Sequence, residues 1–190
     1  RQFIHGTDKR MTNLFDTQLA NSFLSDDYSI SYQGLVEKKL GIALEKKETR
    51  SNWLRRPLSD DQLKYAALDV EYLLHLFKEQ INEMRYSKKL EWHNQDLDKL
   101  ILNVFDDKLI RTDISRSLPR SQENEILFEF NRVVEKVSKK EGINSTLFFS
   151  KKSQKDFLRL VLSKGLDTAC SEITPWRSEL IRHHLLAILK

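Results

Sequence analysis

Tyr65 and Asp69 are the two side chains whose types and spacing could do chemistry together, because a hydrogen-bonding phenol lies four positions before an anionic carboxylate. On a helix, residues four apart lie one turn above each other on the same face. The simplest interpretation is structural: the tyrosine donates a hydrogen bond to the acid, and the spacing alone favours this. The helix face that would carry both residues contains one acid and no cation to balance its charge.

The pair belongs to a predicted helix that begins at Ser59 and runs to about Met84. Ser59 and Gln62 have the spacing of a capping box, in which each side chain bonds to the backbone amide of the other residue. Pro57 lies just before this cap, so the sequence marks the start of the helix clearly.

This helix has three faces when its residues are stepped by about 100° each, whereas a simple surface helix has two. One face is charged and is expected to meet solvent. A second holds Tyr65, Asp69, Tyr72 and Leu76. The third is expected to be the core stripe, and its members are Leu63, Ala67, Val70, Leu74 and Phe77.

A basic segment without clear periodicity precedes the helix, at residues 44–58. Lysine and arginine neutralise phosphates, and an indole ring can stack on a base, so this segment is a candidate nucleic-acid-binding site. The alternative is a solvated loop whose tryptophan fills the core, and the sequence leaves both interpretations open. The candidate binding residues are Lys46, Lys47, Arg50, Trp53, Arg55 and Arg56.

The composition excludes several classes of protein. The 190 residues are 39% hydrophobic and 32% charged, which is typical of a globular chain and too apolar for a disordered one. A single cysteine, Cys170, cannot form an internal disulfide or a cysteine-based zinc site, and it fits a reducing compartment such as the cytoplasm. No apolar run approaches the ~20 residues that cross a membrane.

The net charge of +4 comes from residues 101–190 and mildly favours polyanionic partners.

Most of the remaining chain has helical periodicity. A brief strand is expected at 12–17, ending near Asp16, and Ser117-Leu118-Pro119-Arg120 marks a boundary. Gly41 and Gly142 are expected to end helices, and Pro175 to begin one. The expected helices are 16–24, 31–40, 86–102, 121–140, 151–164 and 175–189.

Other catalytic motifs are not found in the sequence. Its five glycines are scattered and form no phosphate-binding loop, and no serine or cysteine nucleophile motif is present. His183 and His184 are adjacent on a predicted helix and therefore do not face one metal site, so they are expected to meet solvent.

Three motifs occur together in residues 14–77: Phe15-Asp16-Thr17-Gln18, the run Arg50…Trp53…Arg56-Pro57-Leu58, and Tyr65-x-x-x-Asp69. In this combination the segment resembles the second half of the exonuclease domain of the ribonuclease D family. The stretches ISRSLPRSQENEILFEF and TPWRSELIRHHLLAIL look like the helical nucleic-acid-binding module at the C-terminus of the same family.

The resemblance implies a fold that is mainly α in this chain. Residues 1–90 would be the C-terminal part of an α/β ribonuclease H-like exonuclease domain, 91–117 a linker, and 118–190 a small all-helical module of the helicase/ribonuclease D C-terminal type. Most strands of the parent sheet would precede residue 1. We therefore expect residues 1–90 to expose apolar surface that those strands would cover.

The resemblance also implies an activity. Members of the family are 3′→5′ exonucleases that release nucleoside monophosphates from structured RNA such as tRNA precursors, using two Mg²⁺ or Mn²⁺ ions. Asp69 would be a metal ligand, and Tyr65 would position the attacking water. The basic segment would face the RNA backbone, with further RNA contacts from Lys151, Lys152, Lys155 and Arg159.

Departures from the family pattern limit this expectation. The Asp-x-Glu motif of the family is absent, and the third acid is expected to precede residue 1, because Asp8 lies too close to Asp16 and Asp16 itself is expected to be structural. Asn52 stands where an acid is common. An isolated carboxylate cannot hold two Mg²⁺ ions. We therefore expect an incomplete form of the enzyme; the alternative is a non-catalytic RNA-binding or scaffold protein on a degenerate exonuclease fold.

Overall fold

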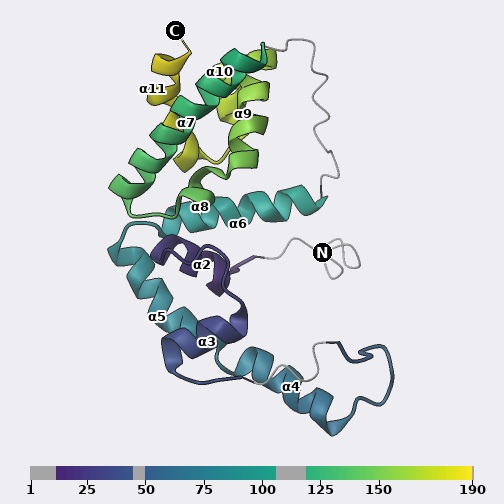
Figure 1. Cartoon of the computed structure of the whole chain (residues 1–190). Coiled ribbons are helices and arrows are strands. Elements are labelled where there is room, and N and C mark those ends of the chain that lie inside the picture. Colours follow the sequence, from purple (N-terminus) through teal and green to yellow (C-terminus); the bar gives the residue numbers. More distant parts are fainter. Residues whose placement is uncertain (1–11, 45–49, 106–118, 190) are drawn as a thin grey trace.

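The computed structural model describes residues 12–44, 50–105 and 119–189, and the described residues form helices and connecting loops with no strand (Figure 1). This confirms the mainly helical fold. Within the same residues, no helix combines the length and apolar composition needed to cross a membrane. The helices are α2 (Thr17–Leu24), α3 (Tyr32–Leu40), α4 (Asp60–Glu71), α5 (Leu73–Tyr86), α6 (Leu90–Phe105), α7 (Arg120–Glu141), α8 (Ser145–Phe149), α9 (Lys151–Lys164), α10 (Leu166–Ser171) and α11 (Pro175–Ile188).

The expected strand at 12–17 is wrong. Residues 12–16 form no ladder with any described segment, and Asn13 has a φ of 55°, a left-handed conformation that interrupts an extended chain. Asp16 instead caps α2, where its carboxylate accepts from the amides of Gln18 and Leu19 at 2.9 and 3.0 Å. Asp16 therefore has the structural role expected for it.

Several helix ends fall where the sequence places them. Gly41 ends α3 with a φ of 70°, and Gly142 ends α7 with a φ of 60°, both left-handed conformations that glycine adopts at little cost. Pro175 occupies the first turn of α11. Ser59 and Gln62 form both bonds of the predicted capping box at the start of α4.

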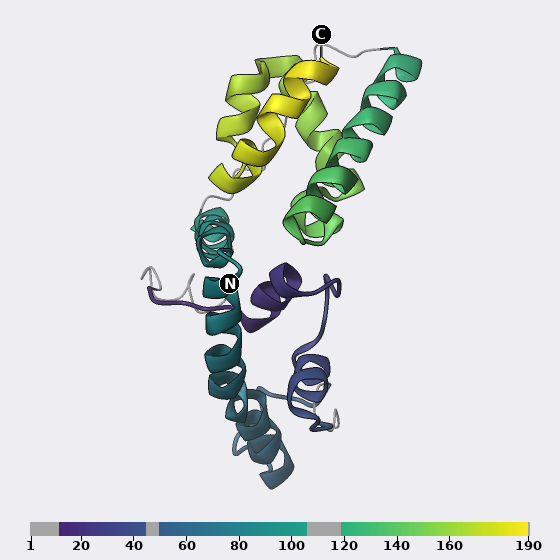
Figure 2. The ribbon, with the colours of Figure 1, turned by 90° about the vertical axis from the view of Figure 1, so that its left-hand side faces the viewer.

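The helix expected from Ser59 to about Met84 is two helices. α4 ends at Glu71, Tyr72 has a φ of −96° and a ψ of −3°, and α5 begins at Leu73. Figure 2 shows α4 and α5 as one broken column, with α2 and α3 on one side of it.

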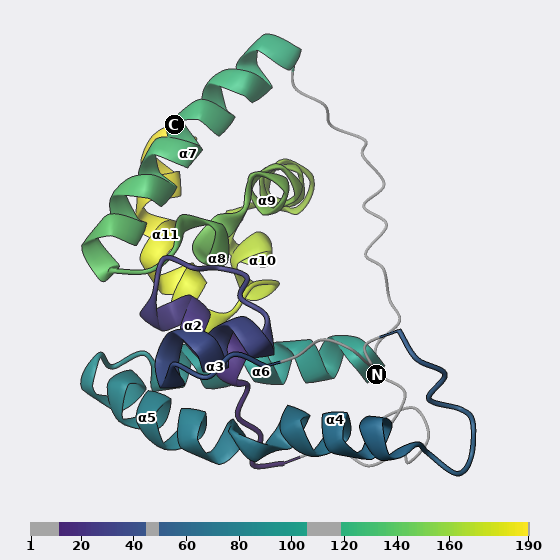
Figure 3. The same ribbon diagram turned by 60° about the horizontal axis from the view of Figure 1, so that its bottom comes forward.

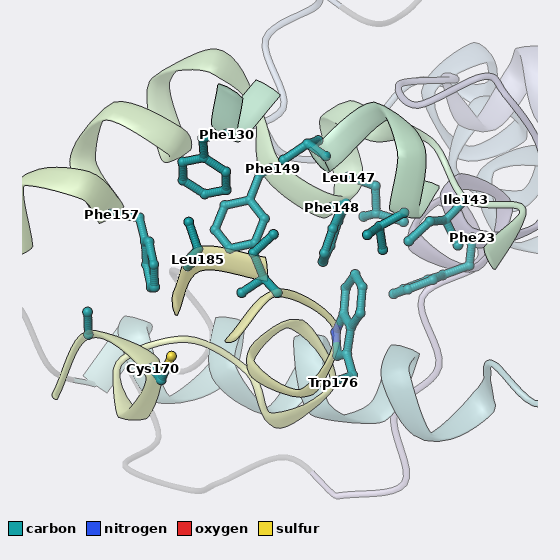
Figure 4. Packing of buried hydrophobic residues seen from close by; sticks show 14 of the residues in the cluster. Phe23, Phe130, Ile143, Leu147, Phe148, Phe149, Phe157, Cys170, Trp176 and Leu185 are labelled. Carbon is teal, nitrogen blue, oxygen red and sulfur yellow. The ribbon is translucent and has the colours of Figure 1, made fainter. Parts of the chain in front are cut away.

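The main core is centred on Trp176, at the start of α11 (Figure 4). Its ring stacks on Trp92 of α6 and on Phe148 of α8, with centroids 5.0 and 5.6 Å apart. Phe23 of α2 meets the same indole edge-on at 5.6 Å. One buried side chain thus contacts residues from three other helices, and each aromatic pair adds about 0.5–1.5 kcal/mol beyond the area it buries.

A buried ion pair lies beside this indole. The Arg177 guanidinium binds both carboxylate oxygens of Asp96, with Nη2 and Oδ2 2.9 Å apart, and Trp176 donates its Nε1–H to the same carboxylate. Arg177 also donates to the backbone carbonyls of Leu147 and Phe148. The two charges are therefore fully hydrogen-bonded, as buried charges must be.

Further bonds tie the N-terminal helices to the C-terminal ones. The buried Lys89 ammonium donates to the carbonyls of Phe23 and Gly142 at 3.0 and 2.6 Å, and burial lowers the pKa of this lysine. Residues from 1–90 and 118–190 consequently share one hydrophobic core. The proposed domain boundaries remain a prediction, although residues 91–105 of the expected linker belong to α6, which lies between α5 and the C-terminal helices (Figures 1 and 3).

The ion pair between α6 and α11 can be tested by substitution. Asp96→Ala leaves the half-buried Arg177 guanidinium without its counter-charge, and we expect it to lower the free energy of unfolding by about 3 kcal/mol. Asp156→Ala, at an exposed position of α9, is the control and should change it by less than about 0.5 kcal/mol. Urea denaturation followed by circular dichroism measures both values; equal effects would contradict the role given to Asp96.

Candidate functional site

Tyr65 and Asp69 lie on α4, and both side chains are half-buried. The indole of Trp53, from the preceding loop, lies 6.0 Å from the Tyr65 ring between centroids. From α3, the Gln33 side-chain amide donates to the Tyr65 hydroxyl at 3.5 Å, the outer limit of a hydrogen bond. The Tyr65 phenol is therefore contacted by the loop and by α3.

A second tyrosine reaches the backbone beside this pair. The Tyr32 hydroxyl donates to the carbonyl of Leu68 at 3.0 Å and accepts from the amide of Tyr72 at 3.3 Å. In a continuous helix those two backbone groups would bond to each other. The Tyr32 hydroxyl stands between them, at the point where α4 gives way to α5.

The segment that carries Tyr32 is fixed by a small second core. Leu35 and Val36 of α3 pack against Leu76 of α5, and all three are fully buried. At the other end of α3, Lys39 forms ion pairs with Glu79 and Glu83 at 3.0 and 2.9 Å. Burial lowers the pKa of Lys39, but its bonds to Glu83 and Glu79 outweigh burial and raise it overall.

The faces of α4 and α5 are assigned the wrong way round in the sequence-based prediction. The expected core stripe of Leu63, Ala67, Val70, Leu74 and Phe77 is exposed, with Val70 at 61% and Leu74 at 67%. The face with Tyr65, Asp69, Tyr72 and Leu76 turns inward toward α3 instead. Periodicity shows that a helix has an apolar face, but it does not show which face a neighbouring helix covers. Here α3 covers the face with Tyr65, Asp69, Tyr72 and Leu76. The expectation that this part of the chain exposes apolar surface is confirmed.

The basic loop is described only in part, because Lys46 and Lys47 lie outside the described residues. Arg50 and Arg55 are exposed, and Trp53 is half-buried. Arg56 turns back on the loop, donating to the carbonyls of Trp53 and Arg55 at 2.7 and 2.9 Å. Arg56 therefore helps to shape the loop as well as adding charge.

A hollow of about 530 Å³ opens between this loop and the start of α4. Arg55, Arg56, Ser51 and Asn52 are among the residues that line it. Two guanidinium groups beside hydroxyl and amide groups are suited to a phosphate.

The four residues of α9 that are predicted to contact RNA lie apart from this loop. Lys151, Lys152 and Lys155 are exposed and Arg159 is half-buried. Figures 1 and 2 show α9 and α4 on opposite sides of α6. The two basic groups expected to bind RNA are thus not brought together.

A metal centre of the expected kind needs several carboxylates. Across residues 12–44, 50–105 and 119–189, no three histidine, cysteine, aspartate or glutamate side chains are grouped closely enough to hold an ion. Asp69 could supply one ligand, but the described donors do not make a set that fits two divalent ions.

The sequence-based reasoning missed Tyr32 and Gln33. Their contacts join residues 32 to 40 positions apart, and the local pattern showed only a short helix with Leu35 and Val36 in its core. No local signal in the sequence could have revealed them.

Comparisons with known proteins agree on one family. Residues 2–85 match the family described as 3′-5′ exonuclease. Ribonuclease D of Xanthomonas oryzae is 42% identical over 91 residues, which are 48% of this chain and 25% of that protein. Ribonuclease D of Shewanella sp. is 36% identical over 98 residues, or 52% of this chain and 25% of the relative. The chain spans about a quarter of the length of these relatives.

A solved structure shows the same fold. The crystal structure of Escherichia coli RNase D, described as an exoribonuclease involved in structured RNA processing, aligns with a TM-score of 0.53 and 20% identity. The alignment covers 98% of this chain and 51% of that one, so the likeness includes the C-terminal helices.

The inverted faces of α5 can be tested with one substitution made at two positions. Leu76→Ala removes a fully buried side chain, and we expect the free energy of unfolding to fall by about 2–5 kcal/mol. Leu74→Ala, at a position that is 67% exposed on the same helix, should cost less than about 0.5 kcal/mol. Urea denaturation gives both values. A larger loss of unfolding free energy for Leu74→Ala than for Leu76→Ala would show that the predicted core stripe is the buried face.

Proposed function

We propose that this chain, which is related to ribonuclease D through its 3′-5′ exonuclease segment, acts in the 3′→5′ removal of nucleotides from RNA. The observation that carries the proposal is the placement of Tyr65 and Asp69: they lie within the matched segment, half-buried on one helix, and Tyr65 contacts both α3 and the basic loop. The substrate class proposed is structured RNA such as tRNA precursors, acted on in the cytoplasm with release of nucleoside monophosphates.

The roles proposed for the pair follow from their chemistry. The Tyr65 hydroxyl can accept and donate hydrogen bonds, so it can orient the water that attacks the terminal phosphodiester. The Asp69 carboxylate is a suitable oxygen ligand for Mg²⁺ or Mn²⁺. Such ions, when bound, supply Lewis acidity at the phosphate. A two-ion centre would need further oxygen ligands, and the described residues group no set of three potential ligands with Asp69.

The RNA backbone is proposed to run past the basic loop. Arg50 and Arg55 are exposed, and neither makes a side-chain bond to the described part of the chain, so their charges are available to phosphates. Trp53 presents an aromatic ring next to Tyr65, where a base could stack. Lys46 and Lys47 complete the proposed set, and the basic residues of α9 are proposed as a second, separate contact.

One observation favours a second candidate function. The described residues bring no other acid into a metal-binding group with Asp69. A non-catalytic RNA-binding or scaffold protein on a degenerate exonuclease fold would keep the loop and the helical module without needing a complete metal centre.

Asp69→Asn tests the catalytic proposal. With Mn²⁺ and a 3′-extended RNA, the unaltered chain should release mononucleotides, and Asp69→Asn should reduce the release to the level seen without metal, because the amide cannot replace the anionic ligand. Chromatography of the products measures the rate. Asp61→Asn, the same change on an exposed residue of the same helix, is the control and should keep full activity.

Two outcomes would count against catalysis by this pair. Activity that survives Asp69→Asn removes Asp69 from the site. An inactive chain that still binds RNA favours the non-catalytic function.

Arg55→Ala tests the proposed RNA path. If Arg55 neutralises one phosphate, the substitution should weaken binding of single-stranded RNA and reduce the slope of log affinity against log salt by about 0.7. Fluorescence anisotropy at several salt concentrations measures that slope. Arg85→Ala, an exposed arginine of α5 away from the loop, should leave it unchanged, and equal slopes for both variants would remove the loop from the RNA path.

A further inference from the structure

We propose that Tyr32 is a positioning residue for the Tyr65–Asp69 pair, acting through the single hydroxyl that it inserts between α4 and α5. The structural part of this inference, that Tyr32 holds the helix junction, rests on hydrogen bonds. The catalytic part, that the junction positions a catalytic pair, rests on the proposed function. Neither the family match nor the motifs of the sequence assign a role to this residue.

The junction requires an outside group. The last turn of α4 carries Asp69, and the carbonyl of Leu68 would ordinarily accept from the amide of Tyr72. The Tyr32 hydroxyl takes both of these backbone groups, at 3.0 and 3.3 Å, while the Tyr72 amide also turns toward the carbonyl of Val70. A side chain inserted into the helical ladder is a recognised cause of a helix break.

The inserted hydroxyl comes from a fixed segment. Ser31 caps α3 through a 3.1 Å bond to the amide of Gly34, so the first turn that carries Tyr32 is well defined. Leu35 and Val36 bury α3 against Leu76, one turn beyond the junction. The position of the Tyr32 hydroxyl is thus set by contacts that do not involve the pair it serves.

Two consecutive residues of α3 bond to α4 at and beside the pair. Gln33 donates to the Tyr65 hydroxyl, and Tyr32 bonds the backbone on either side of Asp69. α3 therefore contacts α4 at two points about one turn apart, the Tyr65 phenol and the backbone on either side of Asp69. Gln33 is the weaker of these contacts because its bond is 3.5 Å long.

The acid and the Tyr32 phenol also interact electrostatically. Burial raises the pKa of Tyr32, the bond from the Tyr72 amide opposes it, and the negative charge of Asp69 raises it further. The phenol is consequently neutral and able to donate to Leu68 at every pH where an exonuclease would be assayed.

Tyr32→Phe separates the hydroxyl from the ring. The variant keeps the aromatic ring in the second core but frees the carbonyl of Leu68 and the amide of Tyr72 to bond to each other, which would join α4 to α5 and shift Asp69. We expect kcat for Mn²⁺-dependent RNA trimming to fall roughly ten- to a hundred-fold with KM unchanged, because a small displacement of a catalytic group costs rate rather than binding. The matched control is Tyr86→Phe, at a tyrosine that is 93% exposed, and it should change neither constant.

A second measurement keeps the two proposals distinguishable. Nuclear magnetic resonance of the full chain should show, in Tyr32→Phe but not in Tyr86→Phe, shifted backbone carbon signals at residues 68–73 together with shifted side-chain signals of Tyr65 and Asp69. If the unaltered chain has no exonuclease activity, the proposed function fails, and these signals alone decide whether Tyr32 positions the pair. Unshifted Tyr65 and Asp69 signals, an unchanged kcat, or a loss of activity that merely follows the unfolded fraction would each overturn the inference.

Discussion

The buried contact between α6 and the first turn of α11 is the constraint on which the other contacts depend. Taking Asp96 and Arg177 out of water costs several kcal/mol per charge. Their bidentate bond offsets that cost only because the remaining donors of Arg177 reach the carbonyls of Leu147 and Phe148. Those carbonyls belong to α8, so a single guanidinium fixes three helices relative to one another.

The N-terminal helices are built on that arrangement. Phe23 of α2 packs on the indole next to Arg177, and Lys89 bonds the end of α2 to the end of α7. α5 is held near this core by Met84, but α4 extends away from it, and among the described residues the hydrophobic cluster nearest the candidate site is the small one around Leu76. The site therefore lies in the part of the fold with the fewest buried apolar contacts, where local opening requires the least free energy.

Features of the fold that depend on neighbouring residues were predictable from the sequence. The capping box at Ser59, the glycine end of α3 at Gly41 and the proline start of α11 involve atoms a few positions apart, and all are present. The placement of Tyr65 and Asp69 one turn apart on one helix was predictable in the same way, from their spacing.

The failures all depend on contacts between distant residues. The junction at Tyr72 involves the side chain of Tyr32, 40 positions away. The helical pattern continues through residue 72, so the sequence does not indicate a break there. The stripe containing Leu74 is predicted to be the core because its residues are apolar. Burial is decided by α3, which packs against the opposite face of α5, the face with Leu76. A strand at 12–16 would have needed a partner that the described residues do not offer.

The bond from Asn144 to the carbonyl of Asp26 has a consequence for synthesis of the chain. It joins residues 118 positions apart, and the contact of Phe23 with Trp176 spans a still longer stretch. At roughly 5–20 residues per second, a ribosome needs on the order of ten seconds to deliver the partners of α2 after α2 itself has emerged. During that interval α5 and α6 can cover α2 only in part, because Phe23 still lacks the Trp176 indole. The segment related to the exonuclease therefore gains its complete set of native contacts only after the C-terminal helices have been made.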